Sequence, residues 1–275
     1  MPSKMQVRFF VFPTAEELAD AAARYFITRI PEETGEAARI AISGGSTPKL
    51  MLQMLGSDEY ARFADRWENL ELYWVDERCV PPDSPDSNYK MTEEALLAWV
   101  PLRPEQVHRM EGELAPEEAA ARYEAELRNS FRLEGAELPR FDLVMLGLGP
   151  DGHTASIFPH TEAVDVMLPL VTANHVAKLD AWRLTLTWPV INQAREVVFL
   201  VAGAEKAAIL HEVLFGERDP ERLPAQLIWP ASGKLVFLLD EAAAAKMPRE
   251  GAQHEEHVWS NVIELDRSRV DELIG

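Results

Sequence analysis

The sequence predicts an α/β fold with a mainly parallel, doubly wound sheet and helices on both of its faces. Segments typical of strands and of helices alternate from one end of the chain to the other, as they do when helices cover a parallel sheet. The apolar run at 143–146 has the composition of a strand buried on both faces. The 275 residues contain neither an internal repeat nor a low-complexity linker, so we expect residues 1–275 to form a single domain.

The expected strands are short apolar or β-branched runs that end at Gly, Pro or charged residues. They lie at 7–12, 39–42, 70–75, 107–110, 143–146, 170–173, 183–188, 197–202 and 234–239, with a further strand near Val262.

The expected helices lie between these strands, at 14–29, 48–55, 89–99, 116–131, 189–193 and 205–214. Thr14 and Glu17 have the spacing of a capping box, which predicts a helix start. Pro48 suits the first turn of the second helix, with Ser46 or Thr47 near its cap. The segment 79–88 holds three prolines and is expected to be a loop.

The charge balance argues against two classes of partner. Lys and Arg number 27 against 46 Asp and Glu, a net charge of −19, whereas nucleic acids and anionic membranes bind clustered Lys and Arg. The sequence has neither an apolar run of membrane-spanning length nor the features of a signal peptide. The single cysteine, Cys79, excludes an internal disulfide and fits a reducing compartment. We expect a cytoplasmic monomer with a small-molecule substrate.

The segment 142–159 contains the first candidate for chemistry. After the strand at 143–146 the chain breaks at Gly147 and Gly149, and the break carries Asp151 and His153. Ligands of open α/β sheets bind at the carboxyl ends of the strands. His153 is therefore a candidate active-site base, although a turn that happens to contain a histidine has the same pattern.

The turn Ser43-Gly-Gly-Ser-Thr-Pro48 follows a strand and opens a helix. Gly44 and Gly45 would let the backbone approach a ligand, and the free N–H groups of a helix start favour an anion such as phosphate. The Ser46 and Thr47 hydroxyls can add hydrogen bonds. The turn matches neither GxxxxGK[ST] nor GxGxxG, so it implies no nucleotide, and an ordinary capped strand–helix turn would look the same.

Charged side chains stand at the ends of further elements. Asp76 and Arg78 end the strand at 70–75, Lys206 begins a helix after the strand at 197–202, and Arg183 lies at a strand start. Because parallel strands end at the same edge of a sheet, we expect several of these groups to converge with the turn and loop above.

We expect no metal site. The sequence lacks a zinc-type Cys and His spacing, and His254 and His257 are three residues apart rather than the four of HExxH. Cys79 has no histidine near it in sequence, so we expect it to be inert.

Taken together, these motifs resemble the signature blocks of the glucosamine-6-phosphate isomerase/6-phosphogluconolactonase family. The blocks are Ser43–Pro48, Trp74–Arg78 with Ser87-Asn88-Tyr89, Gly147–Pro159, Arg183–Thr187, Ala202–Lys206 and Ser232–Asp240. The resemblance implies a Rossmann-like fold similar to glucosamine-6-phosphate deaminase. It also implies hydrolysis of 6-phospho-D-glucono-1,5-lactone to 6-phospho-D-gluconate, the second step of the oxidative pentose phosphate pathway, without a metal or organic cofactor.

One position separates the two activities of this family. The deaminase carries a catalytic glutamate five residues after the histidine, where this chain has Phe158, so the resemblance favours the lactonase. A deaminase-like isomerase is the enzymatic alternative. A non-catalytic sugar-phosphate sensor would not need His153. The segment 178–182 departs from the proline-containing sequence usual in the lactonases.

The resemblance also assigns roles to the candidate residues. His153 is expected to be the general base, Arg78 to stabilise the oxyanion, and either Asp151 or Asp76 to orient the water or the imidazole. The residues expected to bind the substrate, chiefly its phosphate, are Gly44, Gly45, Ser46, Thr47, Asn88, Arg183 and Lys206.

Overall fold

The computed structural model describes residues 7–33, 35–230, 232–248, 253–254 and 257–264. Its main sheet has nine strands in the order β11-β12-β1-β10-β9-β6-β2-β3-β5, and all neighbours except β11 and β12 pair in parallel. The strands are β1 (Val7–Phe12), β2 (Ala38–Ile42), β3 (Leu70–Trp74), β5 (Val107–His108), β6 (Leu143–Gly147), β9 (Glu196–Val201), β10 (Lys234–Asp240), β11 (Gln253–His254) and β12 (His257–Glu264).

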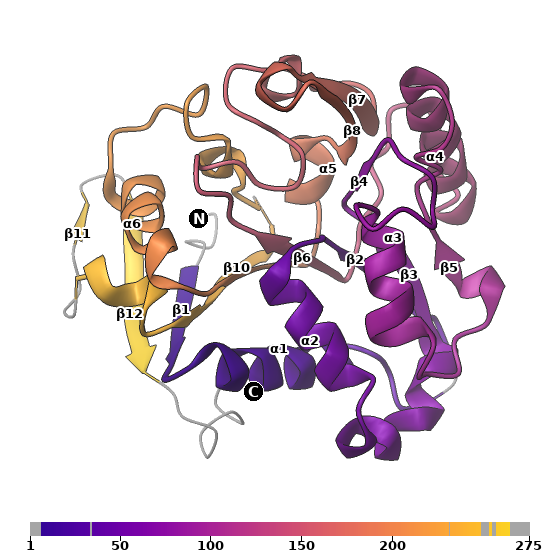
Figure 1. Cartoon of the computed structure of the whole chain (residues 1–275), viewed down its shortest axis with the longest axis horizontal. Helices are drawn as coiled ribbons and strands as arrows, with labels where there is room; N and C mark the ends of the chain where they lie inside the picture. The colour runs from indigo at the N-terminus through magenta and orange to yellow at the C-terminus, as the bar shows by residue number, and fades with distance from the viewer. Residues whose placement is uncertain (1–6, 34, 231, 249–252, 255–256, 265–275) are drawn as a thin grey trace.

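Helices cover both faces of this sheet. In Figure 1, α1 and α2 lie on one side of the sheet, and α5, α6 and a smaller sheet lie on the other. The α-helices are α1 (Ala15–Thr28), α2 (Ser46–Leu55), α3 (Asn88–Thr92), α4 (Pro116–Ser130), α5 (Trp188–Asn192) and α6 (Ala207–Phe215). The predicted mainly parallel α/β fold is confirmed, whereas the single domain over residues 1–275 stays a prediction.

Shorter helical turns join these elements. The 3₁₀ turns are Asp58–Asn69, Pro104–Gln106, Glu162–Val164, Ala177–Leu179, Ala204–Lys206, Pro224–Leu227 and Ala243–Lys246, and a π turn, Glu93–Leu97, continues α3. No helix in the described ranges is both long enough and apolar enough to cross a membrane.

Local sequence signals account for the main boundaries. The backbone N–H of Glu17 donates to Thr14 Oγ1 at 3.2 Å, so the predicted cap of α1 forms. Leu143 to Leu146 of β6 are all buried, as their composition predicts. The helix expected at 89–99 forms as α3 and the π turn that follows it.

The order of the strands creates one switch point, between β2 and β6. From β2 the chain continues to β3 and β5 on one side of the sheet, and from β6 it continues to β9 and β10 on the other. The loops after β2 and β6 therefore diverge, and such a divergence leaves a crevice at the carboxyl edge. The backbone N–H of Ser43 donates to the carbonyl oxygen of Met145 at 3.1 Å, which holds the starts of the two loops together.

Residues 76–78 do not simply end the third strand, as the sequence suggests. The Val75 N–H still donates to the carbonyl of Ile42, but the Val75 carbonyl accepts from Leu186 N–H, so the chain leaves the main sheet there. A second sheet of three antiparallel strands follows, in the order β4-β8-β7. Its strands are β4 (Asp76–Arg78), β7 (Val171–Val176) and β8 (Ala181–Leu186). The pattern of alternation does not reveal this sheet, since two of its strands occupy positions where further parallel strands are expected.

Glu77 ties the second sheet to α3. Its side chain is buried and accepts from the backbone N–H groups of Arg78, Asn88 and Tyr89 at 2.7, 2.7 and 2.8 Å, and from Ser87 Oγ at 3.0 Å. Burial raises the pKa of Glu77, and the four donors oppose that rise by favouring the carboxylate. The carboxylate thus fixes β4 against the loop before α3.

Replacing Glu77 with Gln should destabilise the fold, because an amide can accept on one atom only and its NH₂ group would face backbone donors. We expect Glu77→Gln to lower the free energy of unfolding by about 2 kcal/mol, measured by urea unfolding. The exposed Glu118 on α4 provides the matched control, and Glu118→Gln should stay within about 0.5 kcal/mol of the parent. Equal stabilities of the two variants would contradict the role given to Glu77.

Candidate active site

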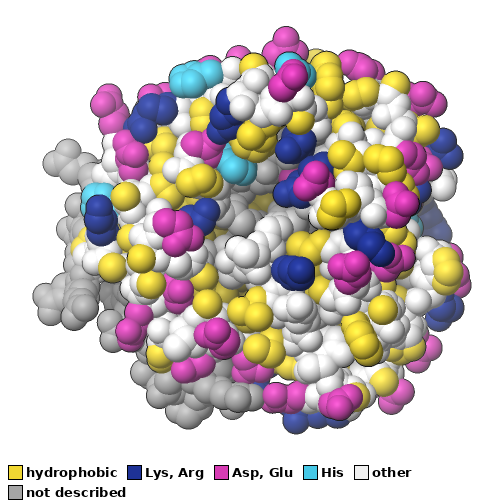
Figure 2. Space-filling view, viewed as in Figure 1, with side chains coloured by type: hydrophobic (Ala, Val, Ile, Leu, Met, Phe, Trp, Pro, Cys, Tyr) yellow, Lys and Arg dark blue, Asp and Glu magenta, His cyan; other side chains and the backbone are white. Residues whose placement is uncertain are grey.

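A cavity of about 410 Å³ opens at the carboxyl edge of the main sheet, beside the switch point. It is lined by the turn at 43–48, parts of the loop at 147–158, two residues of β4, the tip of the β7–β8 hairpin and the segment after β9. Figure 2 shows the hollow near the middle of this face, with Lys and Arg side chains around it and a histidine beside it. Its size suits a small-molecule ligand.

The structure brings together almost all the residues singled out from the sequence. Those that line the cavity are Gly44, Gly45, Ser46, Thr47, Asp76, Arg78, Asp151, His153, Arg183 and Lys206.

Asn88 is the exception, since the cavity lining does not include it. Its side chain is buried and donates to the carbonyl oxygen of Asp76 at 2.9 Å. A Cβ added at Gly44 would lie 1.8 Å from Asn88 Oδ1, so the glycine is needed for this close approach. In this structure Asn88 therefore supports Asp76 and packs against the 43–48 turn, and its expected contact with the substrate stays a prediction.

The turn after β2 presents the start of α2 to the cavity. Gly45 is the N-cap of this helix, with a φ of +114°, and within the described residues no side chain caps it. The first N–H groups of α2 therefore remain available, at the end of the helix that carries partial positive charge. This arrangement suits an anion such as phosphate.

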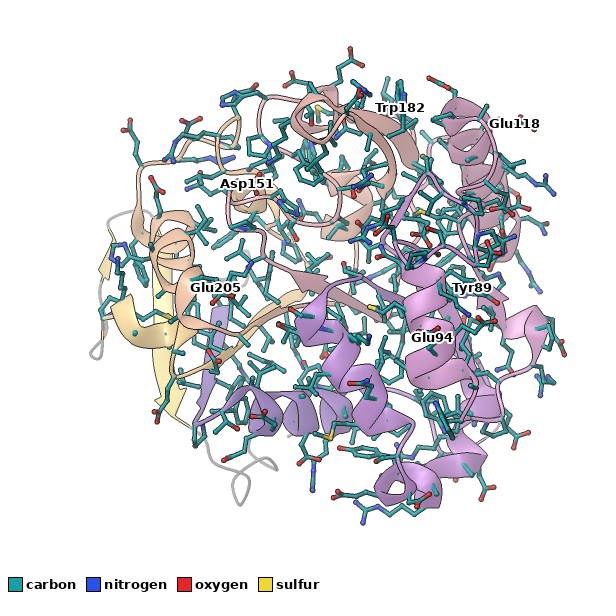
Figure 3. All side chains as sticks on the ribbon, viewed as in Figure 1. Tyr89, Glu94, Glu118, Asp151, Trp182 and Glu205 are labelled. Atoms are coloured by element: carbon teal, nitrogen blue, oxygen red, sulfur yellow. The ribbon has the colours of Figure 1, made fainter. Side chains whose placement is uncertain are left out.

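Asp151 and His153 form a pair on the loop after β6. Asp151 Oδ1 lies 2.5 Å from His153 Nδ1. Since an ionised carboxylate can only accept, it holds the imidazole proton on Nδ1 and leaves Nε2 with a free lone pair. A Cβ added at Gly149 would lie 2.0 Å from His153 Nδ1, so only glycine leaves room for the ring. Figure 3 shows Asp151 on this loop, between Trp182 of the hairpin and Glu205.

The imidazole of His153 is neutral at pH 7. Burial lowers its pKa to about 4; nearby Asp76 opposes this effect, and the cations Lys206, Arg183 and Arg78 add to it. The ring of Phe158 stacks on the imidazole with 4.0 Å between centroids. His153 can therefore accept a proton at physiological pH without first losing one.

Asp76, which lies near the imidazole, has hydrogen-bond partners of its own. Its Oδ2 accepts from Ser156 Oγ at 2.7 Å, and its backbone pairs with Thr185 of β8. Asn174 of β7 in turn donates to the carbonyl of Ser156 at 2.9 Å. This buried polar network joins the loop after β6 to the second sheet.

Arg78 and Arg183 occupy directly paired positions on β4 and β8. Burial lowers the pKa of Arg183, and the charge of Arg78 lowers it further. Like charges at paired positions of antiparallel strands are destabilising, so an anion bound between them would relieve the repulsion. The antiparallel sheet thus explains how Arg183, at a strand start, reaches the same site as Arg78.

Lys206 is placed by Asp240. Both carboxylate oxygens of the buried Asp240 accept from the backbone N–H of Gly203, at 3.1 and 3.0 Å. The N–H of Lys206 then donates to the carbonyl of Gly203 at 3.0 Å, which forms the turn before α6. The sequence motif around Asp240 does not by itself predict this role. The available signal is a carboxylate at the end of a parallel strand.

Lys178 is a further cavity residue that sequence reasoning missed. It lies in the turn Ala177–Leu179 at the tip of the β7–β8 hairpin, and its Nζ forms an ion pair with Asp151 Oδ2. The neighbouring sequence does not predict this contact, because it depends on the long-range arrangement of the β7–β8 hairpin beside the cavity.

The part of the chain that the structure describes holds no group of three or more His, Cys, Asp or Glu side chains suited to a metal ion. The segment His254 to His257 includes residues 255–256, which lie outside the described residues. Cys79 is half-buried, and burial raises its pKa to about 11, so its thiol is protonated near neutral pH.

Comparison with known proteins gives a consistent family match. The family model described as "Glucosamine-6-phosphate isomerases/6-phosphogluconolactonase" matches residues 13–237. A 6-phosphogluconolactonase of Synechocystis sp. is 45% identical over 222 residues, which are 80% of this chain and 89% of the relative.

Solved structures agree in fold. The 6-phosphogluconolactonase from Trypanosoma cruzi superposes with a TM-score of 0.77 at 30% identity, covering 89% of this chain and 98% of that one. A monomeric glucosamine-6-phosphate deaminase superposes with a TM-score of 0.68 at 21% identity, over 88% of this chain and 100% of that one, a likeness in fold alone.

Inorganic phosphate should bind this cavity and stabilise the protein. At about 100 times its dissociation constant a ligand adds about 2.7 kcal/mol to the free energy of unfolding, which corresponds to a rise of several degrees in Tm. We expect Arg183→Met to remove most of this rise. In phosphate-free buffer the same variant should be no less stable than the parent, because the repulsion from Arg78 is gone. Thermal unfolding at constant ionic strength measures both effects.

Arg195 provides a matched control for this experiment. Its side chain is more than half exposed and pairs with Asp142 outside the cavity lining, so Arg195→Met should keep the full response to phosphate. An equal phosphate response in Arg183→Met and in the parent would rule out the proposed anion site.

Proposed function

The chain belongs to the glucosamine-6-phosphate isomerase/6-phosphogluconolactonase family, and we propose that it hydrolyses 6-phospho-D-glucono-1,5-lactone to 6-phospho-D-gluconate. The observation that carries the proposal is a neutral His153 whose Nδ1 is held by Asp151 in a cavity lined with cations. Hydrolysis of a lactone, a cyclic ester, needs a base for water and positive charge for an oxyanion, and this cavity offers both.

Substrate binding begins with the phosphate. Its oxygens accept from the first N–H groups of α2 and from Ser46 and Thr47, and they pair with the cations Arg183 and Lys206. These contacts do not change during the reaction. They hold the lactone carbonyl close to His153 and thereby convert binding energy into orientation.

In the chemical steps, His153 Nε2 takes a proton from water as the water oxygen attacks C1. Arg78 stabilises the negative charge that develops on the carbonyl oxygen. The tetrahedral intermediate then collapses by breaking the bond between C1 and the ring oxygen. The leaving ring oxygen receives the proton from His153, and the product acid loses its proton to solvent, so the base is regenerated.

The two carboxylates have separate parts in this mechanism. Asp151 touches the imidazole and is the residue that orients it. Asp76, which accepts a hydrogen bond from Ser156, stabilises the imidazolium through space and balances the charge of the arginines. Of the two alternatives that the sequence leaves open, Asp151 is therefore our proposed orienting residue.

The deaminase-like reaction is less well supported. In the deaminases a carboxylate stands where this chain has Phe158, and here that side chain is an apolar ring stacked on His153. Release of ammonia from glucosamine 6-phosphate would support this alternative. The monomeric state, the cytoplasmic location and the absence of a nucleic-acid partner stay predictions.

Removal of the base tests the proposal. We expect His153→Gln to lower kcat by about 10²–10⁴, since that is the usual contribution of a general base. The assay follows acid release from freshly made lactone with a pH indicator and subtracts the spontaneous opening. The exposed His211 on α6 serves as the control, and His211→Gln should keep parental kcat. No excess over the spontaneous rate in the parent protein, or a normal kcat in His153→Gln, would refute the assignment.

The pH dependence follows from the pKa of His153, which burial lowers to about 4. The base works only when unprotonated, so kcat/KM should be flat near neutrality and fall as the pH drops through about 4. A phosphate monoester also titrates near pH 6, so the profile is repeated with the unphosphorylated lactone, which lacks that ionisation. An acidic limb near the ordinary imidazole value of about 6.5 with both substrates would contradict a buried neutral base.

A further inference from the structure

The tip of the β7–β8 hairpin lies at the cavity. The turn Ala177–Leu179 ends at Asp180, which has a left-handed φ of +45° that turns the chain sharply into β8. Lys178 and Leu179 of this tip line the cavity, together with Asp151 and His153 from the loop after β6. Residues far apart in sequence thus meet at the proposed base.

Lys178 contacts both of the groups that hold His153 in place. Its Nζ pairs with Asp151 Oδ2, while the other oxygen of the same carboxylate lies 2.5 Å from His153 Nδ1. The Nζ also lies 4.8 Å from the centroid of the Phe158 ring, which stacks on the imidazole. The Lys178 ammonium therefore contacts two neighbours of the imidazole, the carboxylate of Asp151 and the ring of Phe158.

This double contact restricts the geometry of the carboxylate. With Oδ2 engaged by Lys178, Asp151 presents Oδ1 to the imidazole, and exchange of the two oxygens by rotation is hindered. The cation–π contact holds the Phe158 ring in its stacked position on the imidazole. An ion pair with a half-exposed lysine adds little to folding stability, so its main effect is on local orientation.

We infer that Lys178 is a positioning residue for the proposed hydrolysis, fixing Asp151 and Phe158 around His153 so that Nε2 stays unprotonated and aimed into the cavity. This inference rests on the proposed function. The tip of the β7–β8 hairpin would then help to place the base, although its sequence departs from the usual lactonase pattern.

The charges around His153 predict the sign of the effect. Asp76 on β4 and Asp151 on its own loop favour the imidazolium, whereas Arg78 on β4, Arg183 on β8 and Lys206 after β9 disfavour it. Lys178 adds a cation to this set through Asp151. Its removal leaves the carboxylate less compensated, so the pKa of His153 rises.

The first test needs no substrate. Nitrogen-15 NMR of labelled histidine follows the tautomer and the pH titration of His153, assigned by its loss in His153→Gln. In Lys178→Met we expect the midpoint to rise by about one pH unit and the Nε2–H tautomer to gain population. Lys178→Arg should restore the parental signals, and Lys246→Met, an exposed lysine outside the cavity lining, should leave them unchanged. Parental signals in Lys178→Met would overturn the inference.

The second test separates positioning from binding. We expect Lys178→Met to lower kcat about 10-fold with KM within about 3-fold of the parent, and Lys178→Arg to recover most of kcat. A rise in KM alone would show that Lys178 binds the substrate. A Lys178→Arg variant that does not recover kcat would show that the positive charge is not what matters. Either result overturns the inference. If the parent protein does not hydrolyse the lactone, the proposed function fails, and the NMR titration still decides whether Lys178 controls His153.

Discussion

The parallel pairing of β2 with β6 is the constraint on which the site depends. The two strands are joined at their carboxyl ends, where Ser43 N–H donates to the Met145 carbonyl, and beyond that point the chain diverges to opposite halves of the sheet. The loop after β2 leads to the N-terminus of α2, which no side chain of the described residues caps, and the loop after β6 carries Asp151 and His153. The proposed anion site and the proposed base therefore lie in one crevice because of strand order.

Electrostatics couples these two proposed functions. The chain carries a net charge of −19, yet Arg78, Arg183 and Lys206 gather at the cavity. The cations that suit the phosphate also disfavour protonation of His153, and so does burial of the ring. The proposed base therefore stays neutral beside the proposed phosphate site, and the buried Asp76, which accepts a hydrogen bond from Ser156, partly opposes the lowering of its pKa.

The sequence predicts much of this because its strongest signals are local. Buried strands such as 143–146, the Thr14 cap and the glycines beside polar side chains each depend on near neighbours, and the shared strand edge follows from parallel order. The second sheet depends on long-range pairing that no local pattern encodes, since the chain changes sheets at Val75. For that reason the sequence does not predict the pairing of Arg78 with Arg183, the contact of Lys178 with Asp151 or the hydrogen bond from Asn88 to Asp76.

The source of the oxygen added to the lactone tests the central claim most directly, because His153 is held to activate water while Asp76 and Asp151 form no bond to the substrate. A single turnover with enzyme in excess in H₂¹⁸O, quenched before spontaneous opening contributes, should give 6-phosphogluconate with one ¹⁸O in its carboxylate from the first turnover. Unlabelled product in that first turnover, with ¹⁸O appearing later in an enzyme carboxylate, would show attack by an aspartate and contradict general-base catalysis by His153.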